Sequence, residues 1–261
     1  MEKKKLTKPF FSIITVVKND ENNIQKTIKS IASQNLKNFE YIVIDGKSTD
    51  DTIKNIKKYR NKISYFLSER DKGIYFAMNK GIKIAKGSFL LFVNSGDLLT
   101  KNALNIVYKL YQKNKEIDFI FGTVRRHYIT ETITKSGYNK FRLNYNFDFA
   151  TSHSTGFFIK LKSLNKVGKF NTMYKYSADY DFYYRAIIKK KLKGISTNKN
   201  KLVGIMKSGG YSSKISFLDH ILEEQKIRLN NGQNFLFVFF IFCNAIFKFL
   251  LKKFFFKLKQ I

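Results

Sequence analysis

The stretch Phe89-Leu-Leu-Phe-Val-Asn-Ser-Gly-Asp97 is the part of the sequence that decides the fold. Its apolar first half has the length and the residue types of one buried strand, and it runs directly into a polar turn that ends at Asp97. Open α/β sheets bind their ligands outside the carboxyl ends of their strands. The stretch therefore predicts a buried strand that carries the Asp97 carboxylate to the ligand-binding edge of such a sheet.

The segment Glu69-Arg-Asp-Lys-Gly-Ile-Tyr75 lies one loop earlier and leads into a predicted helix from Ile74 to Ala85, with Gly87 as its C-cap. The free N–H groups at the start of a helix favour anionic ligands. Three residues stand directly before this helix: Asp71, Lys72 and Gly73. Together with Asp97, they predict a site for a nucleotide diphosphate and its metal.

The remainder of the first half alternates between strand and helix patterns. Apolar and β-branched runs predict strands at residues 10–17, 41–44 and 63–68, and apolar residues three and four apart predict a helix at 23–34. A second helix follows the capping residues at 48–50 and reaches about residue 60. This rhythm is typical of a doubly wound sheet, so we expect an α/β fold with a Rossmann-like, mostly parallel central sheet flanked by helices.

The two common phosphate-binding loops are absent from the sequence. No Gly-x-Gly-x-x-Gly follows the first strand and there is no Walker lysine loop, which argues against a dinucleotide-binding domain. Carboxylates instead end the second and fourth strands, at Asp45 and Asp97, and Asp50 follows in the second loop. A divalent metal held by a carboxylate is then the remaining way to neutralise a diphosphate.

The chain is strongly basic, with 49 Lys and Arg residues against 19 Asp and Glu residues and a formal net charge of +30. Such a charge favours anionic ligands or an anionic membrane surface. A nucleic-acid-binding protein is the less favoured alternative, because the basic residues are spread along the whole chain and no RRM, KH or zinc motif is present. The single cysteine, Cys243, and an N-terminus without the apolar region of a secretory signal predict a cytoplasmic protein.

Five segments in this order resemble the motifs of family 2 glycosyltransferases with the GT-A fold: Ser12 to Asn19, Tyr41 to Asp50, Glu69 to Tyr75, Ala77 to Gly81 and Asn94 to Asp97. The resemblance covers about residues 10–210 and is strongest to transferases of colanic acid, other exopolysaccharides and O-antigen. It implies a catalytic domain at residues 1–231, with a donor half at about 10–123 and an acceptor half at about 124–215. A processive synthase is a poor match, because the chain has no tryptophan for the Gln-x-x-Arg-Trp motif.

The resemblance implies an inverting enzyme that moves a sugar from a nucleotide-sugar, usually a UDP-sugar, to a glycan acceptor. In this branch the acceptor is often carried on a polyprenyl diphosphate lipid or a lipid A core. The implied pathway is therefore the synthesis of a bacterial cell-surface polysaccharide or lipopolysaccharide. A catalytically inactive GT-A scaffold is the alternative, because Ser95 and Ala178 depart from the residues that the family usually has there.

The resemblance also places a set of residues around the nucleotide-sugar: Thr15, Glu21, Asp45, Ser48, Asp50, Asp71, Lys72, Gly73, Asn79, Asn94 and Ser95. Within that set, Thr15 and Glu21 are expected in the first loop, which lines the nucleotide. Asp45 is expected to accept a hydrogen bond from the uracil edge, with Ser48 and Asp50 beside it. For Asp50, a helix cap is the alternative role.

By the same resemblance, Asp71 and Asn79 face the ribose or the donor sugar, and Lys72 contacts a phosphate. Asp97 matches the last carboxylate of the family's Asp-x-Asp motif, which binds Mn²⁺ or Mg²⁺ between the two phosphates. Ser95 replaces the first aspartate of that motif. A hydroxyl is a weaker ligand for a hard cation than a carboxylate, so we expect metal affinity to depend on the diphosphate or on water.

The acceptor half carries the expected general base. The segment from Tyr176 to Arg185 resembles the family's Glu-Asp segment at the start of a helix, and Asp179 matches the aspartate. Asp179 would take the proton of the acceptor hydroxyl; Asp181 is its local competitor, and a helix cap is the structural alternative. Arg185 is expected to pair with an acid, and His153 to contact the acceptor or the metal, with a purely structural histidine as the alternative. Residues 209–212, which contain two glycines, are a candidate closing lid, and an ordinary turn is the alternative.

The last part of the chain, residues 232–261, is rich in phenylalanine and lysine and predicts a helix. Its uninterrupted apolar run, Phe235 to Phe247, is too short to cross a bilayer as a helix. We therefore expect a peripheral anchor on the inner face of the cytoplasmic membrane, with lysines reaching acidic headgroups. A helix docked on the catalytic domain, or one that pairs two subunits, is the alternative, and the oligomeric state stays open.

Overall fold

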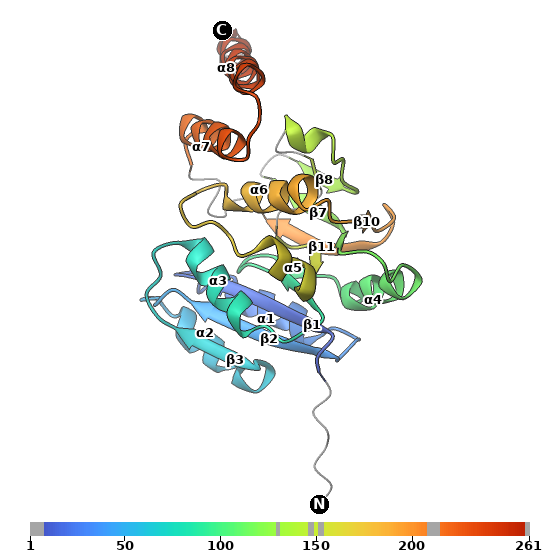
Figure 1. Cartoon of the computed structure of the whole chain (residues 1–261). Coiled ribbons are helices and arrows are strands. Elements are labelled where there is room, and N and C mark those ends of the chain that lie inside the picture. The colour runs from blue at the N-terminus through green and yellow to red at the C-terminus, as the bar shows by residue number, and fades with distance from the viewer. Residues whose placement is uncertain (1–7, 129–130, 146–148, 151–153, 208–214, 259–261) are drawn as a thin grey trace, which may run out of the picture.

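The structure is a computed structural model that describes residues 8–128, 131–145, 149–150, 154–207 and 215–258. Two sheets and the helices around them form the body of the molecule, and two further helices are stacked at the C-terminal end of the chain (Figure 1).

The first half of the chain forms the following elements in order: β1 (Phe11–Val17), α1 (Ile24–Ala32), β2 (Phe39–Asp45), α2 (Thr52–Lys57), the 3-10 helix η1 (Arg60–Lys62), β3 (Tyr65–Ser68), α3 (Ile74–Ile84), β4 (Phe89–Phe92), β5 (Leu98–Leu99), α4 (Ala103–Lys113) and β6 (Phe119–Phe121). The second half forms these: β7 (Thr123–His127), β8 (Thr132–Lys135), the 3-10 helix η2 (Arg142–Asn144), β9 (Phe157–Lys160), α5 (Leu161–Val167), α6 (Ala178–Tyr183), the π-helix η3 (Tyr184–Lys189), β10 (Gly194–Ser196), β11 (Leu202–Lys207), α7 (Phe217–Asn230) and α8 (Phe235–Leu258).

The central sheet has seven strands in the order β10-β6-β9-β4-β1-β2-β3. Its neighbouring strands are parallel except at β9, which is antiparallel to both β4 and β6. A second sheet of four strands has the order β5-β11-β7-β8. The expected α/β architecture with a mostly parallel central sheet is confirmed.

The central strand β1 is buried on both faces, as expected for an inner strand of a parallel sheet. Ile14 and Val16 pack into one apolar cluster, and Ile13 and Val17 pack into the other. Successive side chains of a strand point to opposite faces, so this single strand joins the two halves of the core. The stretch from Phe89, which predicted such a strand, forms β4 directly beside β1.

The register of the strands sets the edge at which ligands are expected. Val17, the last residue of β1, lies opposite Asp45, the last residue of β2, and Asp45 lies opposite Ser68 at the end of β3. Because these three strands end level with one another, the loops that follow them lie side by side.

Gly87 has a different role from the predicted C-cap. Helix α3 ends with Ala85 as its C-cap, two residues earlier. A Cβ atom on Gly87 would lie 2.5 Å from the backbone nitrogen of Ser12, and the Gly87 N–H donates to Ser12 Oγ at 2.8 Å. Glycine is needed here because the chain passes very close to the start of β1.

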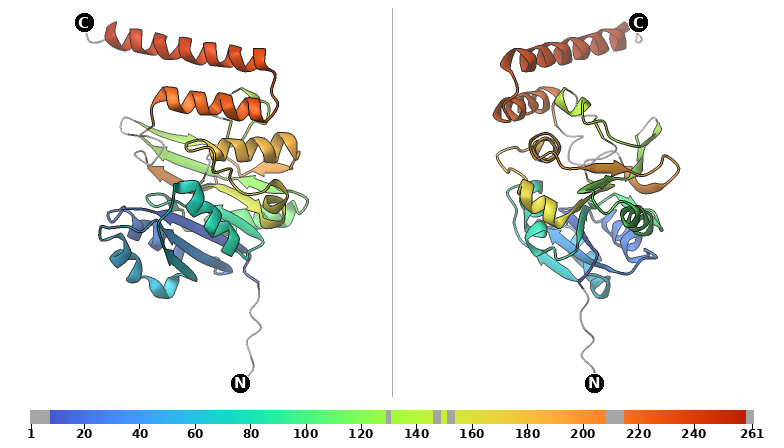
Figure 2. Two further views of the ribbon diagram at one scale, coloured as in Figure 1. Left: turned by 60° about the vertical axis from the view of Figure 1, so that its left-hand side comes forward. Right: turned by 45° about the vertical axis from the view of Figure 1, so that its right-hand side comes forward.

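The C-terminal helices α7 and α8 form an antiparallel hairpin, and α8 is the outermost layer of the molecule (Figure 2). Helix α6 lies under α7, so the order from the core outward is α6, α7 and α8. Helix α8 has 24 residues and is one continuous helix. Among the described residues, no helix combines the length and the apolarity that crossing a bilayer requires.

Candidate active site

The loop after β1 is tied to the loop after β2 by hydrogen bonds. The Asn19 N–H donates to Ser48 Oγ at 2.8 Å, and the Thr49 N–H donates to Asn19 Oδ1 at 2.9 Å. Asn19 takes a left-handed φ of 50°, which asparagine tolerates better than most residues. The Glu21 carboxylate accepts the Asp51 N–H at 2.9 Å. The predicted residues Glu21 and Ser48 therefore lie together in one well-connected rim at the carboxyl edge of the sheet.

Asp45 lies at this rim, but its carboxylate faces inward. It accepts hydrogen bonds from the Ser48 N–H at 3.0 Å, from the Ser48 hydroxyl and from the Ser68 hydroxyl at 2.6 Å, and the residue has no exposed surface. These bonds hold the ends of β2 and β3 together. The expected contact with a uracil edge therefore requires Ser48 or Ser68 to move aside first.

The expectation that Thr15 lies in the first loop is wrong. Thr15 belongs to β1 and is fully buried. Its hydroxyl donates to the Val93 carbonyl at 2.7 Å and accepts from the Tyr41 hydroxyl at 2.9 Å. Thr15 therefore satisfies buried polar groups inside the core and has no surface with which to contact a nucleotide.

The contacts of Asp50 are those of a helix cap, which is the alternative to a nucleotide contact. Its Oδ1 accepts the Thr52 N–H at 3.0 Å at the first residue of α2, and its Oδ2 accepts the Glu21 N–H at 3.2 Å. The carboxylate thus starts α2 and joins the two loops of the rim. Both oxygens are used by the protein backbone.

Asp71 is held by a partner that sequence reasoning missed. The Lys80 ammonium lies 2.5 Å from Asp71 Oδ1 and 2.6 Å from Glu69 Oε1. Burial by itself lowers the pKa of Lys80, but the hydrogen bonds and charges of these two carboxylates outweigh it and raise the pKa. Lys80 lies on α3 and therefore fixes the loop that precedes its own helix. In that loop, Lys72 and Gly73 are exposed at the start of the helix.

Asn79 does not face a ligand, which corrects its predicted role. Its Nδ2 donates to the Phe170 carbonyl at 2.9 Å, and its Oδ1 accepts the Phe170 N–H at 3.0 Å. An amide side chain that pairs with both backbone groups of one residue acts as a clamp. Asn79 therefore fastens α3 to the loop that follows α5.

The turn at residues 94–97 meets the first loop through an unpredicted residue. The Ser95 hydroxyl donates to Asp20 Oδ2 at 2.6 Å. The other oxygen of that carboxylate, Oδ1, accepts from the Asn23 side chain at 2.7 Å. The Asn94 Oδ1 is buried and accepts no hydrogen bond from the described residues. A carboxylate from the first loop thus lies directly beside Ser95, where the metal motif lacks its first aspartate.

Asp97 is buried beside strand β9. Its Oδ2 accepts the Thr155 hydroxyl at 2.7 Å. Burial raises the pKa of Asp97 to about 7, although the Thr155 hydroxyl and the positive charge of Arg126 both lower it. The Asp97 carboxylate therefore lies behind the turn, between the first half of the chain and the strands of the second half.

The oxygens around this turn fit a hard divalent cation. Mg²⁺ and Mn²⁺ prefer carboxylate, carbonyl and hydroxyl oxygens, which Asp20, Ser95 and Asn94 offer at the turn, while the Asp97 carboxylate lies behind the turn and accepts the Thr155 hydroxyl. The part of the chain that the structure describes has no group of three or more His, Cys, Asp and Glu residues that could hold a metal by themselves. This donor set therefore matches a cation that also needs the oxygens of a diphosphate.

The predicted base, Asp179, lies in the first turn of α6 and is partly exposed. Its Oδ1 accepts the Tyr75 hydroxyl at 3.1 Å and the Tyr180 N–H at 2.9 Å. The same Tyr75 hydroxyl lies 2.9 Å from the Tyr176 carbonyl. Burial raises the pKa of Asp179 to about 7, which is suited to a general base near neutral pH.

Glu223 on α7 holds the segment that leads into Asp179, and the sequence contains no local signal for this contact. Its carboxylate accepts three consecutive backbone N–H groups, from Lys175 at 2.5 Å and from Tyr176 and Ser177 at 2.7 Å each. Its negative charge also raises the pKa of Asp179. A residue of the C-terminal hairpin therefore shapes the turn at which the base is presented.

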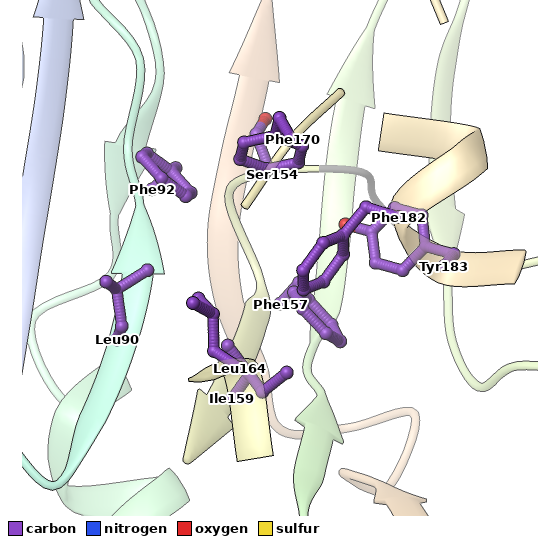
Figure 3. A pocket seen from close by; sticks show the side chains of 9 residues that line it. All are labelled: Leu90, Phe92, Ser154, Phe157, Ile159, Leu164, Phe170, Phe182 and Tyr183. Carbon is purple, nitrogen blue, oxygen red and sulfur yellow. The ribbon is translucent and has the colours of Figure 1, made fainter. Parts of the chain in front are cut away.

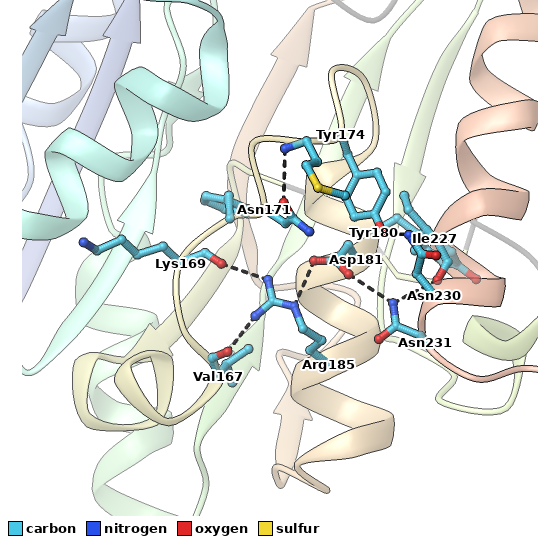
Figure 4. A network of polar contacts seen from close by, with 12 residues as sticks. Val167, Lys169, Asn171, Tyr174, Tyr180, Asp181, Arg185, Ile227, Asn230 and Asn231 are labelled. Carbon is cyan, nitrogen blue, oxygen red and sulfur yellow. Dashed lines mark hydrogen bonds and ion pairs between the residues drawn. The ribbon is translucent and has the colours of Figure 1, made fainter.

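Asp181, predicted on the acceptor side, belongs to a buried structural network (Figure 4). Its Oδ2 accepts the Arg185 Nε–H at 2.8 Å, and its Oδ1 accepts from the Asn231 side chain at 3.0 Å. Arg185 also donates to the carbonyls of Val167 at 2.6 Å and Lys169 at 2.8 Å. Asp181 therefore joins α6 to α5 and to the end of α7, which corrects its predicted role. The expected pairing of Arg185 with an acid is confirmed.

A small apolar pocket lies between the two halves of this site (Figure 3). Its walls include Phe92 at the end of β4, Ser154 before β9, and Tyr183 on α6. Ser154 is adjacent to Thr155, which binds Asp97, and Tyr183 is four residues beyond Asp179. With a volume of about 10 Å³ the pocket has no room for a sugar. A larger hollow of about 510 Å³ is lined by none of the predicted site residues.

Two predicted features lie outside the described residues. These are His153 and the candidate lid at residues 209–212. The residues that contact the candidate site and that sequence reasoning missed are Asp20, Tyr75, Lys80 and Glu223. Tyr75 and Lys80 lie within the quoted motif segments, and Asp20 is an acid in the first loop of a sheet whose ligand edge was already located, whereas Glu223 had no such signal.

A comparison with known protein families shows the family to which this arrangement belongs. The family model of glycosyl transferase family 2 matches residues 12–249, which is most of the chain. The chain belongs to glycosyl transferase family 2. The matched range includes both Asp97 and Asp179.

Individual relatives agree with this family. A protein of Mycobacterium bovis named PGL/p-HBAD biosynthesis glycosyltransferase is 28% identical over 187 residues, which are 68% of this chain and 69% of that protein. Relatives from Mycobacterium tuberculosis reach 41% identity, but this chain spans only 34% of their length.

Solved structures of glycosyltransferases share the fold. The Staphylococcus aureus protein TarS (residues 1–349), solved in complex with UDP-GlcNAc, superposes with a TM-score of 0.69 at 21% identity, over 92% of this chain and 73% of that one. The mannosyltransferase PcManGT of Pyrobaculum calidifontis, solved with GDP-Man and Mn²⁺, has a TM-score of 0.58 at 13% identity, over 87% of this chain and 64% of that one. The fold is the GT-A fold that family 2 membership implies.

Proposed function

We propose that the protein is an inverting glycosyltransferase that moves a sugar from a UDP-sugar to the hydroxyl group of a glycan acceptor. The observation that carries this proposal is the position of Asp179, which a tyrosine of the donor half holds at the first turn of α6 with a pKa of about 7. A carboxylate in that state can accept a proton from a bound alcohol at neutral pH.

The proposed reaction is a single displacement at the anomeric carbon. The acceptor oxygen attacks this carbon on the face opposite the diphosphate, and its proton passes to the Asp179 carboxylate. The bond between the anomeric carbon and the diphosphate oxygen breaks, and UDP leaves with the electron pair. Binding both substrates across the two halves of the site would hold the reacting atoms in line.

The diphosphate is proposed to lie over the turn at residues 94–97 and the exposed start of α3. Lys72 and the free N–H groups of that helix favour negative charge there. Asp97, Asp20 and the Ser95 hydroxyl would hold Mn²⁺ or Mg²⁺ together with the phosphate oxygens. A cation so bound supplies positive charge that stabilises the departing nucleotide. The Mn²⁺ in the PcManGT complex supports this assignment.

The proposals for the donor nucleotide and for the class of acceptor rest on similar proteins. The UDP-GlcNAc complex of TarS supports a UDP-sugar donor. The Mycobacterium bovis relative is named for PGL/p-HBAD biosynthesis, which supports an acceptor that belongs to a biosynthetic pathway. We propose a lipid-linked glycan acceptor for a surface polysaccharide or lipopolysaccharide, used at the cytoplasmic face of the membrane. The basic net charge of +30 is compatible with work at an anionic surface.

The test is a screen of UDP-, GDP- and dTDP-sugars against lipid-linked acceptors, with mass-spectrometric detection, for the wild type and for Asp179→Asn. We expect metal-dependent transfer by the wild type and a loss of at least about 100-fold in the variant. UDP affinity should stay within about twofold in Asp179→Asn, because the base does not touch the nucleotide.

The matched control is Asp51→Asn, which removes an exposed carboxylate whose ion-pair partner within the described part of the chain is Lys54. It should transfer at the wild-type rate. Transfer by Asp179→Asn at more than about a tenth of the wild-type rate would remove Asp179 from the base role. Tight UDP binding without turnover on any acceptor would instead favour the scaffold alternative.

A further inference from the structure

We propose that the outward face of α8 is a membrane-binding surface, on which the helix lies flat in the headgroup region of an anionic phospholipid bilayer. Binding through this surface would hold the proposed transferase at the membrane that carries a lipid-linked acceptor. Lipid binding itself does not depend on the transfer reaction, so the two proposals can fail separately.

One stripe of α8 is already used for packing. Val238 is only 3% exposed, and the half-buried residues that follow it at three- and four-residue spacing lie on the same side of the helix: Ile241, Phe242, Ala245, Ile246 and Phe249. The rings of Phe249 and Phe217 of α7 are stacked with centroids 4.2 Å apart. This stripe attaches α8 to α7 and fixes which side of the helix points outward.

The opposite side of α8 is also apolar, and it is exposed. Leu236 is 73% exposed, Phe240 is 66% exposed and Phe247 is 61% exposed, and Leu250 and Phe254 continue the same face. Their spacing of three, four and seven residues places them on one side of an α-helix. A contiguous exposed face of several large apolar side chains normally marks an interaction site. In the described structure nothing covers this face, because α8 is the outermost layer (Figure 2).

The charges of α8 identify an anionic surface as the occupant. Helix α8 contains four lysines, Lys248, Lys252, Lys253 and Lys257, and no acidic residue. A second copy of the chain docked on this face would bring eight lysines together without a compensating carboxylate. A bilayer with acidic headgroups instead offers both an apolar layer and opposite charge.

The positions of two of these lysines fit a helix that lies in the interface. At 3.6 residues per turn, Lys248 falls on one side of the outward face and Lys253 falls on the other. Lys253 lies over the Phe249 ring at 4.8 Å. Lysine stems at both margins can reach upward to headgroups while the aromatic rings between them enter the acyl boundary.

The test is co-sedimentation of the full chain with liposomes, either phosphatidylcholine alone or a mixture with about one third phosphatidylglycerol. We expect binding to the mixed liposomes, weaker binding to the neutral ones, and a loss of binding as salt is raised. The triple variant Phe240→Ser, Phe247→Ser, Leu250→Ser should lower the partition coefficient at least about tenfold, because it removes the side chains that enter the bilayer.

The matched control is Phe141→Ser with Met173→Ser, which removes two equally exposed apolar side chains away from α8. It should bind liposomes as the wild type does. UDP affinity and circular dichroism show whether each variant is folded, and light scattering gives its oligomeric state. The proposal would be overturned if the wild type did not bind anionic liposomes, or if the triple variant bound them with the same partition coefficient as the wild type. A wild-type dimer that the triple variant converts to a monomer would assign this face to a second copy instead.

Discussion

The hydroxyl group of Tyr75 donates a hydrogen bond to Oδ1 of Asp179 at 3.1 Å, although the two residues are 104 positions apart in the sequence. Tyr75 lies in the first turn of α3, in the donor half, and Asp179 lies in the first turn of α6, in the acceptor half. This bond is therefore a direct link between the loop expected to meet the phosphates and the proposed base.

Tyr75→Phe should lower kcat several-fold and shift its pH dependence to higher pH. The Tyr75 hydroxyl stabilises the charged form of Asp179, so its removal raises the pKa of that carboxyl group. The measurement is kcat against pH for both proteins at saturating donor. An unchanged profile would mean that this hydrogen bond does not form in the working enzyme.

In the wild type, kcat should rise with pH and level off above about pH 7. Burial raises the pKa of Asp179 to about 7, and only the deprotonated form can accept a proton. Below that value the active fraction falls about tenfold per pH unit. Initial rates from pH 5 to 9, with donor binding measured separately, check this prediction, and a flat profile would contradict it.

Glu223→Gln should reduce kcat and shift the profile in the opposite direction, to lower pH. The Glu223 charge raises the pKa of Asp179, so neutralising it lowers that pKa. The KM for the donor should change little, because Glu223 contacts the backbone of residues 175–177 and no donor-site residue. Asp219→Asn, which removes the same charge from the exposed start of α7, is the control and should leave the midpoint in place.

Asp20→Asn should weaken the Mn²⁺-dependent part of UDP affinity by about tenfold or more. Asp20 is the carboxylate that meets Ser95, at 2.6 Å from its hydroxyl, where the metal motif has no aspartate of its own. Calorimetric titration of UDP with Mn²⁺ and with EDTA measures this part directly. Asp51→Asn on the same rim serves as the control, and equal metal dependence in the two variants would exclude Asp20 from the metal site.

Arg185→Met should destabilise the fold by about 3 kcal/mol, because it leaves a buried carboxylate and two carbonyls without their donor. Asp181, its partner, has only 4% of its side chain exposed. Urea unfolding of Arg185→Met, with the exposed neighbour Lys190→Met as control, gives the difference in free energy. A change below about 1 kcal/mol would show that Asn231 alone can satisfy Asp181.

Much of the fold was predictable from local patterns. The apolar runs that end at Asp45 and Asp97 form buried strands β2 and β4, with helices between the strands as expected. Element ends were less certain: the second helix, predicted to reach about residue 60, ends at Lys57 and is followed by the separate 3-10 helix η1. Turn positions depend on contacts made across the sheet, which a local window of sequence does not contain.

The candidate site was predictable in place but not in the role of each residue. Thr15, Asn79 and Asp181 match a motif, yet the polar side-chain atoms of each form hydrogen bonds with other parts of the protein. A motif records which residue types occur together and does not record which way a side chain points. Conversely, Asp20 and Glu223 belong to no predicted site, because their partners are 75 and about 47 positions away in the sequence.

The amino-acid sequence alone determined that this chain alternates strands and helices, that carboxylates end two of its inner strands, and that its last segment is an apolar helix with lysines. Local periodicity and residue type suffice for those statements, since hydrophobic burial acts on each segment separately. Only the tertiary structure decided that α7 covers one side of α8, that Ser95 meets Asp20, and that Tyr75 and Glu223 hold Asp179 and its turn. Those outcomes depend on hydrogen bonds and packing between distant segments, whose partners exist only once the chain has folded.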